Sequence, residues 1–179
     1  RTLIKLEKLK QKVKNVVLEV KNSFEEDLNF NLIIEQKKNQ LIKKKIKHKL
    51  NNQFIEIFEN LIKLKKTKFL LVSLKTEETS LAKCFCFIYK NIFYYYIPLI
   101  SCNHFEKFKP GKILITELIK WCIKNDIKKF DFGLGSEKYK KYFSNREFLL
   151  HRHLNYLSLR GLCVYLLISI FFKIKKLWL

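Results

Sequence analysis

The stretch FKPGKILITELIKWCIKNDIKKFDFGLGSEKYKKYF, residues 108–143, contains three of the four glycines of the chain and one of its two prolines. The rest of the sequence is poor in both residue types, so their clustering indicates backbone geometry that other residues do not permit. Pro110 and Gly111 predict the start of a helix, because proline is favoured at the first helical position. Gly133 and Gly135 follow a strand-like segment and predict that the strand end opens there.

The segment after Pro110 predicts an amphipathic helix. Its apolar face is formed by Leu114, Leu118, Trp121 and Cys122, with lysines opposite. Asn125 can end this helix in the left-handed conformation. The amides of Gly111, Lys112 and Ile113 lack acceptors within the first turn, so they predict an anion site that a pyrophosphate would fit. An ordinary helix cap is the alternative.

The segment IKKFDFG, residues 127–133, predicts a strand with Phe130 and Phe132 on one face and Asp131 on the other. A short helix follows, and Tyr139 lies about one turn into it, with its hydroxyl able to face a cleft beside the strand. An ordinary core tyrosine is the alternative. Asp131 is either a group that orients or deprotonates a substrate amine or a structural acceptor paired with a lysine.

The remaining chain predicts one mixed sheet flanked by helices. The expected helices are residues 1–12, with Leu3, Leu6 and Leu9 on one stripe, residues 24–50, and a further helix that opens at Asn51 and Asn52. The expected strands are residues 15–20, and then 69–75, 81–90 and 91–101 as an antiparallel meander with a tight turn at Lys90 and Asn91. This order indicates an α/β or α+β domain.

The C-terminal part, residues 144–179, predicts an alternating strand from Phe148 and then the apolar segment GLCVYLLISIFF. This segment has about twelve apolar residues, whereas about 20 are needed to span a bilayer. A buried helix or strand is therefore expected, with peripheral membrane contact as the alternative. The length suits a single domain over residues 1–179. The start at Arg1 and the absence of Met predict that this is the C-terminal part of a longer protein.

The net charge is +21, which is typical of proteins that bind nucleic acid or anionic membranes. Of the 37 basic residues, however, only four are arginine, the residue preferred for bidentate phosphate and base recognition. The lysines come with abundant Ile, Asn, Phe and Tyr, which is the profile of an AT-rich coding sequence. We therefore interpret most of them as solvated surface, and a polyanion-binding face is the alternative.

Five cysteines are scattered through apolar runs, which favours reduced core thiols in a cytoplasmic protein over a disulfide framework. Cys84 and Cys86, like His151 and His153, have a spacing that could chelate a metal. No second pair at a zinc-binding spacing accompanies either of them. We therefore expect structural thiols, non-metal histidines and no metal site.

The two glycine-containing segments together resemble the GNAT-type acyltransferases associated with cellulose and exopolysaccharide biosynthesis, which are related to the Fem-type transferases. The matching residues are Pro110, Gly111, Leu114, Phe130, Asp131, Phe132, Gly135, Tyr139 and Lys140. Gly133 falls at a variable position of the pattern and is interpreted as a bystander. The resemblance covers residues 69–143, with the central hairpin before Asn103, a position often held by Asp.

The resemblance implies a GNAT fold that binds acyl-CoA, with acetyl-CoA as co-substrate. Backbone donors at Gly111, Lys112 and Ile113 would hold the pyrophosphate, with added charge from the side chains of Lys109 and Lys112. Tyr139 would protonate the leaving thiolate, with Asp131 as its catalytic companion. Gly135 and Lys140 would contact substrate. The implied activity is transfer of an acyl group to an amine on a sugar or polysaccharide precursor.

The phosphate loop of ordinary GNAT enzymes is richer in glycine than the single Gly111 here. The Fem-type transferases, which use aminoacyl-tRNA instead of CoA, share this reduction. Transfer from aminoacyl-tRNA to a cell-wall peptide is therefore the alternative activity, and tRNA is the one nucleic acid partner expected under it. A non-catalytic basic module that binds membrane or nucleic acid is the third hypothesis.

Overall fold

The structure is a computed structural model that describes residues 2–12, 15–22, 30–48, 50–63, 67–101, 105–150 and 158–177. The chain divides into two compact units, Arg1–Tyr142 and Phe143–Leu179. Each unit is considered by itself below, and the expectation of a single domain over residues 1–179 stays a prediction.

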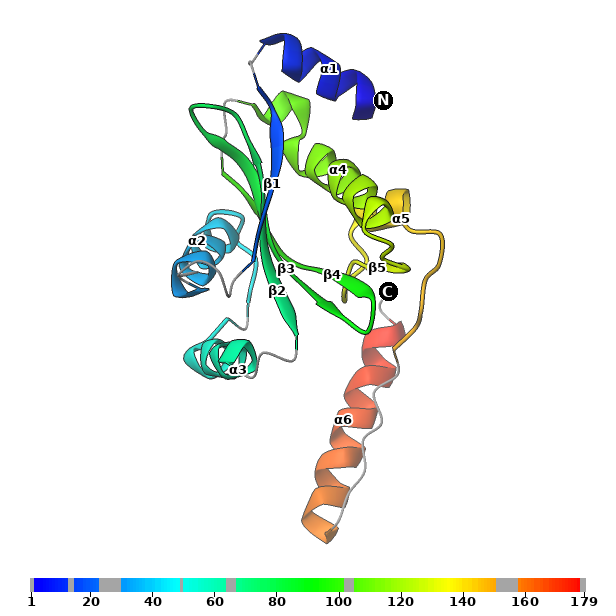
Figure 1. The fold of residues 1–179 in the computed structure, drawn as a ribbon. Coiled ribbons are helices and arrows are strands. Elements are labelled where there is room, and N and C mark those ends of the chain that lie inside the picture. Colours follow the sequence, from blue (N-terminus) through cyan, green and yellow to red (C-terminus); the bar gives the residue numbers. More distant parts are fainter. Residues whose placement is uncertain are drawn as a thin grey trace. The chain divides into compact units, whose positions relative to one another are not determined.

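The first unit is built on a five-stranded sheet (Figure 1). The strands follow one another across the sheet in chain order: β1 (Val17–Asn22), β2 (Lys68–Lys75), β3 (Ser80–Tyr89), β4 (Ile92–Ile100) and β5 (Lys129–Asp131). The first four are antiparallel neighbours, and β5 runs parallel to β4. The predicted mixed, mostly antiparallel sheet is therefore confirmed.

The β3–β4 hairpin turns where the sequence predicted it. Lys90 and Asn91 both have positive φ values, 49° and 61°. A two-residue turn with two positive φ angles matches the right-handed twist of the strands it joins. The hairpin places β3 at the centre of the sheet, and its tight turn sets the register of β4 against β3.

Helices cover both faces of the sheet (Figure 1). One face carries α2 (Phe30–Lys43) and α3 (Asn52–Lys63), and the other carries α4 (Pro110–Lys124), with α1 (Thr2–Lys12) packed against α4. A short 3₁₀ turn (Glu106–Phe108) leads into α4, and α5 (Lys138–Phe143) follows β5. In the described chain, the predicted helix over residues 24–50 is the shorter α2, because Lys45 adopts a positive φ of 56° soon after its end.

The core lies on both faces of the sheet. On the α2–α3 face, Phe30, Ile34 and Phe85 belong to one buried cluster. On the other face, α4 buries Leu114 and Leu118 completely. Burial of one such side chain contributes about 1.5–3 kcal/mol to the hydrophobic stabilisation of the fold.

Two details of the predicted helices are wrong. In α1, Leu6 and Leu9 are buried as expected, but Leu3 on the same stripe is 53% exposed. At the end of α4, Asn125 has a φ of −103° and its amide still donates to Trp121 O, so it belongs to the last turn. The left-handed residue is Asp126, at a φ of 56°.

Strand β4 contains a bulge that the sequence did not predict. Phe85 pairs with Ile97 and Cys86 pairs with Tyr95, which leaves Tyr96 as an extra residue. A bulge of this kind interrupts the alternation of side chains between the two faces. The ring of Tyr96 stacks on Phe58 of α3, and Ile97 belongs to the buried cluster on the same face. The α2–α3 face therefore receives two successive side chains of β4.

In its described residues, the second unit contains the helix α6 (Leu159–Leu177). Most of the strand predicted from Phe148, including His151 and His153, lies outside the described residues, and residues 148–150 are exposed and adopt no strand. The apolar segment is helical as expected. Its predicted burial is not observed within this unit, where Val164 is 55% and Leu167 is 68% exposed. In the part of the chain that the structure describes, no helix is long and apolar enough to cross a membrane.

Candidate active site

The parallel pairing of β4 and β5 is short and leaves part of β4 open. Lys129–Asp131 pairs only with Ile92–Tyr94, whereas β4 continues to Ile100. Within the described chain, residues 95–100 of β4 therefore have no strand neighbour on the β5 side, and we call this stretch the free edge of β4. Pro98 within it has no N–H, and its carbonyl accepts a hydrogen bond from Lys37. The other backbone groups of this edge can bind an extended ligand, as the edge of a sheet binds a peptide strand.

The first turn of α4 lies at the far end of the free edge. A Cβ atom added to Gly111 would lie 3.6 Å from Cδ1 of Ile100, the last residue of β4. Lys109 adopts the left-handed conformation, with φ 54°, and precedes Pro110 at the helix start. The chain thereby turns sharply from the 3₁₀ segment into α4, and the positive end of the α4 dipole is placed beside the free edge.

The sequence predicted three amides without an acceptor at this helix start, and the structure leaves fewer of them without one. Lys112 N and Ile113 N both donate to Lys109 O, at 2.9 and 3.4 Å. Among the described residues, Gly111 therefore has the first-turn N–H without a backbone acceptor. The prediction for Lys112 and Ile113 is corrected on this point, because the carbonyl of Lys109 already points into the helix.

The side chains around this helix start differ in their exposure. Lys109 is exposed, whereas Ile113 is completely buried in the core. Lys112 Nζ lies 4.9 Å from the centre of the Tyr142 ring, in a cation–π contact. Lys109 and Lys112 thus supply positive charge near the Gly111 amide, while the side chain of Ile113 has a structural role.

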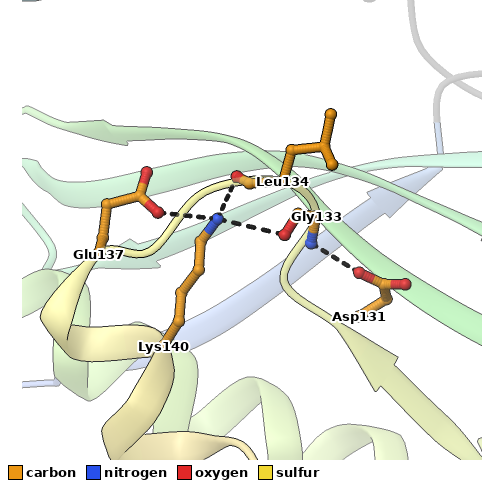
Figure 2. A network of polar contacts seen from close by, with 5 residues as sticks. All are labelled: Asp131, Gly133, Leu134, Glu137 and Lys140. Atoms are coloured by element: carbon orange, nitrogen blue, oxygen red, sulfur yellow. Dashed lines mark hydrogen bonds and ion pairs between the residues drawn. The ribbon is translucent and has the colours of Figure 1, made fainter. Parts of the chain in front are cut away.

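The loop between β5 and α5 is held by a network of polar contacts (Figure 2). Lys140 Nζ donates to the carbonyl oxygens of Gly133 and Leu134, at 3.3 and 2.5 Å, and pairs with Glu137 Oε2 at 2.9 Å. These contacts use all three hydrogens of the ammonium group. Lys140 is buried, so it acts here as the anchor of the loop, and the substrate contact predicted for it stays a prediction.

Glu137 is held ionised by this network. Burial is the largest single influence and acts to raise the pKa of its carboxyl group. The hydrogen bond from Lys140, a backbone hydrogen bond and the positive charges of Lys140 and Lys37 together outweigh burial, so the pKa is lowered. The same carboxylate restricts the neighbouring glycine, because a Cβ atom at Gly135 would lie 2.5 Å from Glu137 Oε2. Gly135 also has a φ of 114°, a conformation that residues with a side chain rarely adopt.

Gly133 is more than a bystander in this loop. Its φ is 67°, its N–H donates to Asp131 Oδ1 at 2.6 Å, and its carbonyl accepts from Lys140. A Cβ atom added to Gly133 would meet no heavy atom within 4 Å, so its need for glycine is conformational alone. The interpretation of Gly133 as a bystander is thus corrected, although Gly135 remains the more restricted position.

Tyr139 lies where α5 meets β5. Its ring packs edge-on against Phe132, with 6.2 Å between the ring centres. Burial, with smaller contributions from Glu137 and Cys84, raises the pKa of its hydroxyl to about 12. The phenol therefore keeps its proton at neutral pH and can act as a hydrogen-bond donor.

Asp131 faces away from these rings. Phe130 and Phe132 lie 4.7 Å apart and both pack against Tyr95, which confirms the predicted alternation along β5. Asp131 is exposed and accepts a hydrogen bond from Gly133. Among the described residues it forms no ion pair with a lysine, so its structural partner is a backbone amide. Its catalytic role stays a prediction.

Lys37 of α2 is a site residue that the sequence did not indicate. Its Nζ donates to the carbonyl oxygen of Pro98, in the free edge of β4, at 2.7 Å. Burial lowers the pKa of this lysine. It stands in a lysine-rich helix beside Lys38, and no local pattern distinguishes the two.

The four described cysteines, Cys84, Cys86, Cys122 and Cys163, are free thiols. Burial raises the pKa of Cys86 well above its usual value, in keeping with a structural role. Within the described ranges, no group of three His, Cys, Asp or Glu side chains could hold a metal ion.

Known proteins with a similar sequence profile or a similar fold are acetyltransferases by description. The sequence profile of the family described as acetyltransferase (GNAT) domain matches residues 2–141. A solved structure described as a candidate acetyl transferase from Pyrococcus furiosus superposes with a TM-score of 0.51 at 13% identity, covering 76% of this chain and 99% of that chain. At this identity the likeness shows the fold alone. No curated protein matches the chain significantly.

Proposed function

The chain belongs to the acetyltransferase (GNAT) domain family, and we propose that it transfers an acetyl group from acetyl-CoA to a primary amine. One observation carries the proposal beyond family membership. The free edge of β4 begins where β5 parts from it and ends at the first turn of α4. It therefore offers backbone partners to an extended ligand and, at its end, the Gly111 amide for an anion.

The residues present fit the coenzyme. Pantetheine carries two amide groups, which match the backbone groups of residues 95–100 in the free edge. The pyrophosphate would lie against the Gly111 N–H, where the dipole of α4 favours negative charge. Lys109 and Lys112 would add charge there, as the sequence predicted. Acetyl-CoA supplies the thioester that is broken.

Tyr139 and Asp131 have distinct roles in the proposed reaction. The amine nitrogen attacks the thioester carbonyl carbon, the new C–N bond forms, and the C–S bond breaks. The nitrogen must lose one proton and the departing sulfur must gain one. Because the pKa of Tyr139 is about 12, its phenolate does not accumulate, so the phenol donates to the sulfur as it departs. Asp131 would accept the proton from the amine.

The resemblance described above adds a finer prediction, that the amine belongs to a sugar or polysaccharide precursor. The Fem-type alternative predicts instead that the chain binds aminoacyl-tRNA and not acetyl-CoA. Glucosamine as acceptor and an aminoacyl-tRNA as competing donor separate these predictions in one transfer assay. A steep salt dependence of polyanion binding without acetyl-CoA binding would favour the non-catalytic module.

The proposal is tested by calorimetric titration of acetyl-CoA. We expect the wild-type chain to bind, and Gly111→Val to weaken the affinity about tenfold, because the branched side chain would stand beside Ile100 at the end of the free edge. Gly111→Ala is the matched control, since its Cβ meets Ile100 only at ordinary contact distance. Absence of binding to any acyl-CoA would refute the proposal.

A further inference from the structure

A cavity of about 250 Å³ lies on the α2–α3 face of the sheet, the face opposite to α4. Leu41, Leu50, Phe54, Tyr96 and Ile97 supply its apolar and aromatic walls. Lys37 and His48 also line the cavity and are basic, and among the described residues no acidic side chain lines it. Pockets for drug-sized ligands have about 300–1,000 Å³, so this cavity suits a smaller molecule.

The bulge in β4 joins this cavity to the free edge. Because Tyr96 and Ile97 both face α2 and α3, two successive residues of β4 form one wall of the cavity. The Tyr96 ring is stacked on Phe54 and Phe58, with ring centres 6.4 and 5.1 Å apart. The wall is therefore rigid and aromatic, and it belongs to the strand that would hold the acyl donor on its other side.

Lys37 stands at the border between the cavity and the free edge. Its ammonium donates to Pro98 O at 2.7 Å and more weakly to Gln40 Oε1 at 3.5 Å, which leaves one of its three hydrogens for a ligand. Among the described residues it has no carboxylate at ion-pair distance, and only a weak electrostatic influence reaches it from Glu137. The Lys37 side chain is half-buried, and a partly buried charge without a counterion is costly, so an anionic group would be favoured here.

We propose that this cavity binds the acceptor, and that the acceptor is a free α-amino acid with an apolar or aromatic side chain. The carboxylate would pair with Lys37, and the side chain would fill the space between Tyr96, Phe54 and Leu50. In an α-amino acid a single carbon separates carboxylate and amine. Anchoring the carboxylate beside Pro98 therefore brings the amine to the free edge, along which the acyl donor is proposed to lie.

This inference rests on the proposed acyl transfer and names its acceptor. The amine attacks the thioester carbon, the C–N bond forms, and the thiol of CoA leaves with the proton that the amine releases. The products are an N-acetyl amino acid and free CoA. A sugar amine has neither the anionic group that Lys37 favours nor an apolar body for the cavity walls.

The test uses L-phenylalanine, with phenethylamine, L-serine and glucosamine as comparison compounds. Binding is measured by calorimetry without acetyl-CoA, and acetylation is measured as release of free thiol. We expect L-phenylalanine to bind and to be acetylated at least tenfold more efficiently than the other three. Equal or better use of phenethylamine, serine or glucosamine would overturn the proposal.

The role of Lys37 is tested by substitution. Lys37→Met should weaken phenylalanine binding at least tenfold and leave the affinities for phenethylamine and acetyl-CoA within twofold. Lys37→Arg should retain phenylalanine binding within about threefold, and this variant keeps the test decisive if the Met variant does not fold. Lys38→Met, the neighbouring lysine, is the control and should change nothing. Unchanged phenylalanine binding in Lys37→Met would overturn the proposal.

The proposed acyl donor and the proposed acceptor cavity would be refuted by different results. Phenylalanine binding without any acetyl-CoA binding would leave the cavity assignment standing and refute the donor. Acetyl-CoA binding without phenylalanine binding would refute the cavity assignment and leave the acyl transfer standing.

Discussion

The two ends of the candidate site are built by different means. At the first turn of α4, backbone geometry makes the site: Lys109 O accepts from the amides of Lys112 and Ile113, and the Gly111 N–H has no backbone acceptor among the described residues. At the β5–α5 loop, a single side chain, Lys140, holds two carbonyl groups and a carboxylate. A site made by backbone tolerates side-chain changes, whereas a loop held by one ammonium group depends on that residue. The α4 end should therefore control donor affinity, and the loop should control turnover.

The largest expected effect tests the loop end at its proposed catalytic group. Tyr139→Phe should lower kcat at least about 100-fold, within the range of 10² to 10⁴ typical for loss of a general acid. Affinity for acetyl-CoA should stay within twofold, because the ring contact with Phe132 is retained. Steady-state kinetics and calorimetry on the same preparation measure both values.

Tyr142→Phe is the matched control for this variant. Tyr142 lies on the same short helix, is exposed, and keeps its ring beside Lys112 after the substitution. Its kcat should equal that of the wild type. If Tyr139→Phe retained more than half of the wild-type kcat, Tyr139 would not be the acid, and the comparison between the two ends would lose its main support.

The second effect concerns the anchor of the loop. Lys140→Met removes the donor from the carbonyl groups of Gly133 and Leu134 and should lower the free energy of unfolding by roughly 1–2 kcal/mol. The loop that places Tyr139 would loosen, so kcat should fall while acetyl-CoA affinity at α4 stays within about threefold. Chemical denaturation and calorimetry test the two statements separately.

Lys138→Met provides the control, since Lys138 is an exposed lysine on the same helix. It should be neutral in both measurements. A Lys140→Met variant that lost acetyl-CoA binding as strongly as Gly111→Val would show that the two ends are not separate, and the comparison would have to be abandoned.

The parts of the fold that the sequence predicted are those with a local signal. Pro110 with Gly111 marks a helix start, because proline is favoured at the first helical position. Lys90 with Asn91 lies between two strand-like runs and marks a two-residue hairpin turn. The end of α4 shows the limit of such signals: Asn125 was predicted to be the left-handed residue, and Asp126 is the left-handed residue in the structure. Both residue types tolerate positive φ, and the choice depends on where the last helical hydrogen bond forms.

The missed features depend on contacts that are distant in sequence. Tyr94, Tyr95 and Tyr96 are identical residues in a row, and the bulge at Tyr96 is set by the register against β3. Lys37 belongs to the site because its ammonium group donates a hydrogen bond to the carbonyl of Pro98, 61 residues away. No period or motif in the lysine-rich helix distinguishes such a residue from its solvated neighbours.

The smallest expected effect is a pH dependence of the loop anchor. Burial opposes ionisation of Glu137, but the hydrogen bonds to its carboxylate and the positive charges of Lys140 and Lys37 together outweigh it, so the pKa of Glu137 is lowered in the folded chain. A group with a lowered folded pKa stabilises the fold above its unfolded pKa, which is about 4.3 for Glu. This contribution is lost as the pH falls through the folded value.

Glu137→Gln should therefore lower Tm slightly at pH 7, and the difference from the wild type should shrink as the pH is lowered towards 3. Because the Glu137 side chain is 56% exposed, solvent and salt screen its pairing with Lys140, and the difference should also shrink in high salt. Thermal unfolding of both chains at the two pH values measures this effect. A difference that persisted unchanged at pH 3 would mean that the carboxylate charge is irrelevant, and that Lys140 anchors the loop through the Gly133 and Leu134 carbonyl groups alone.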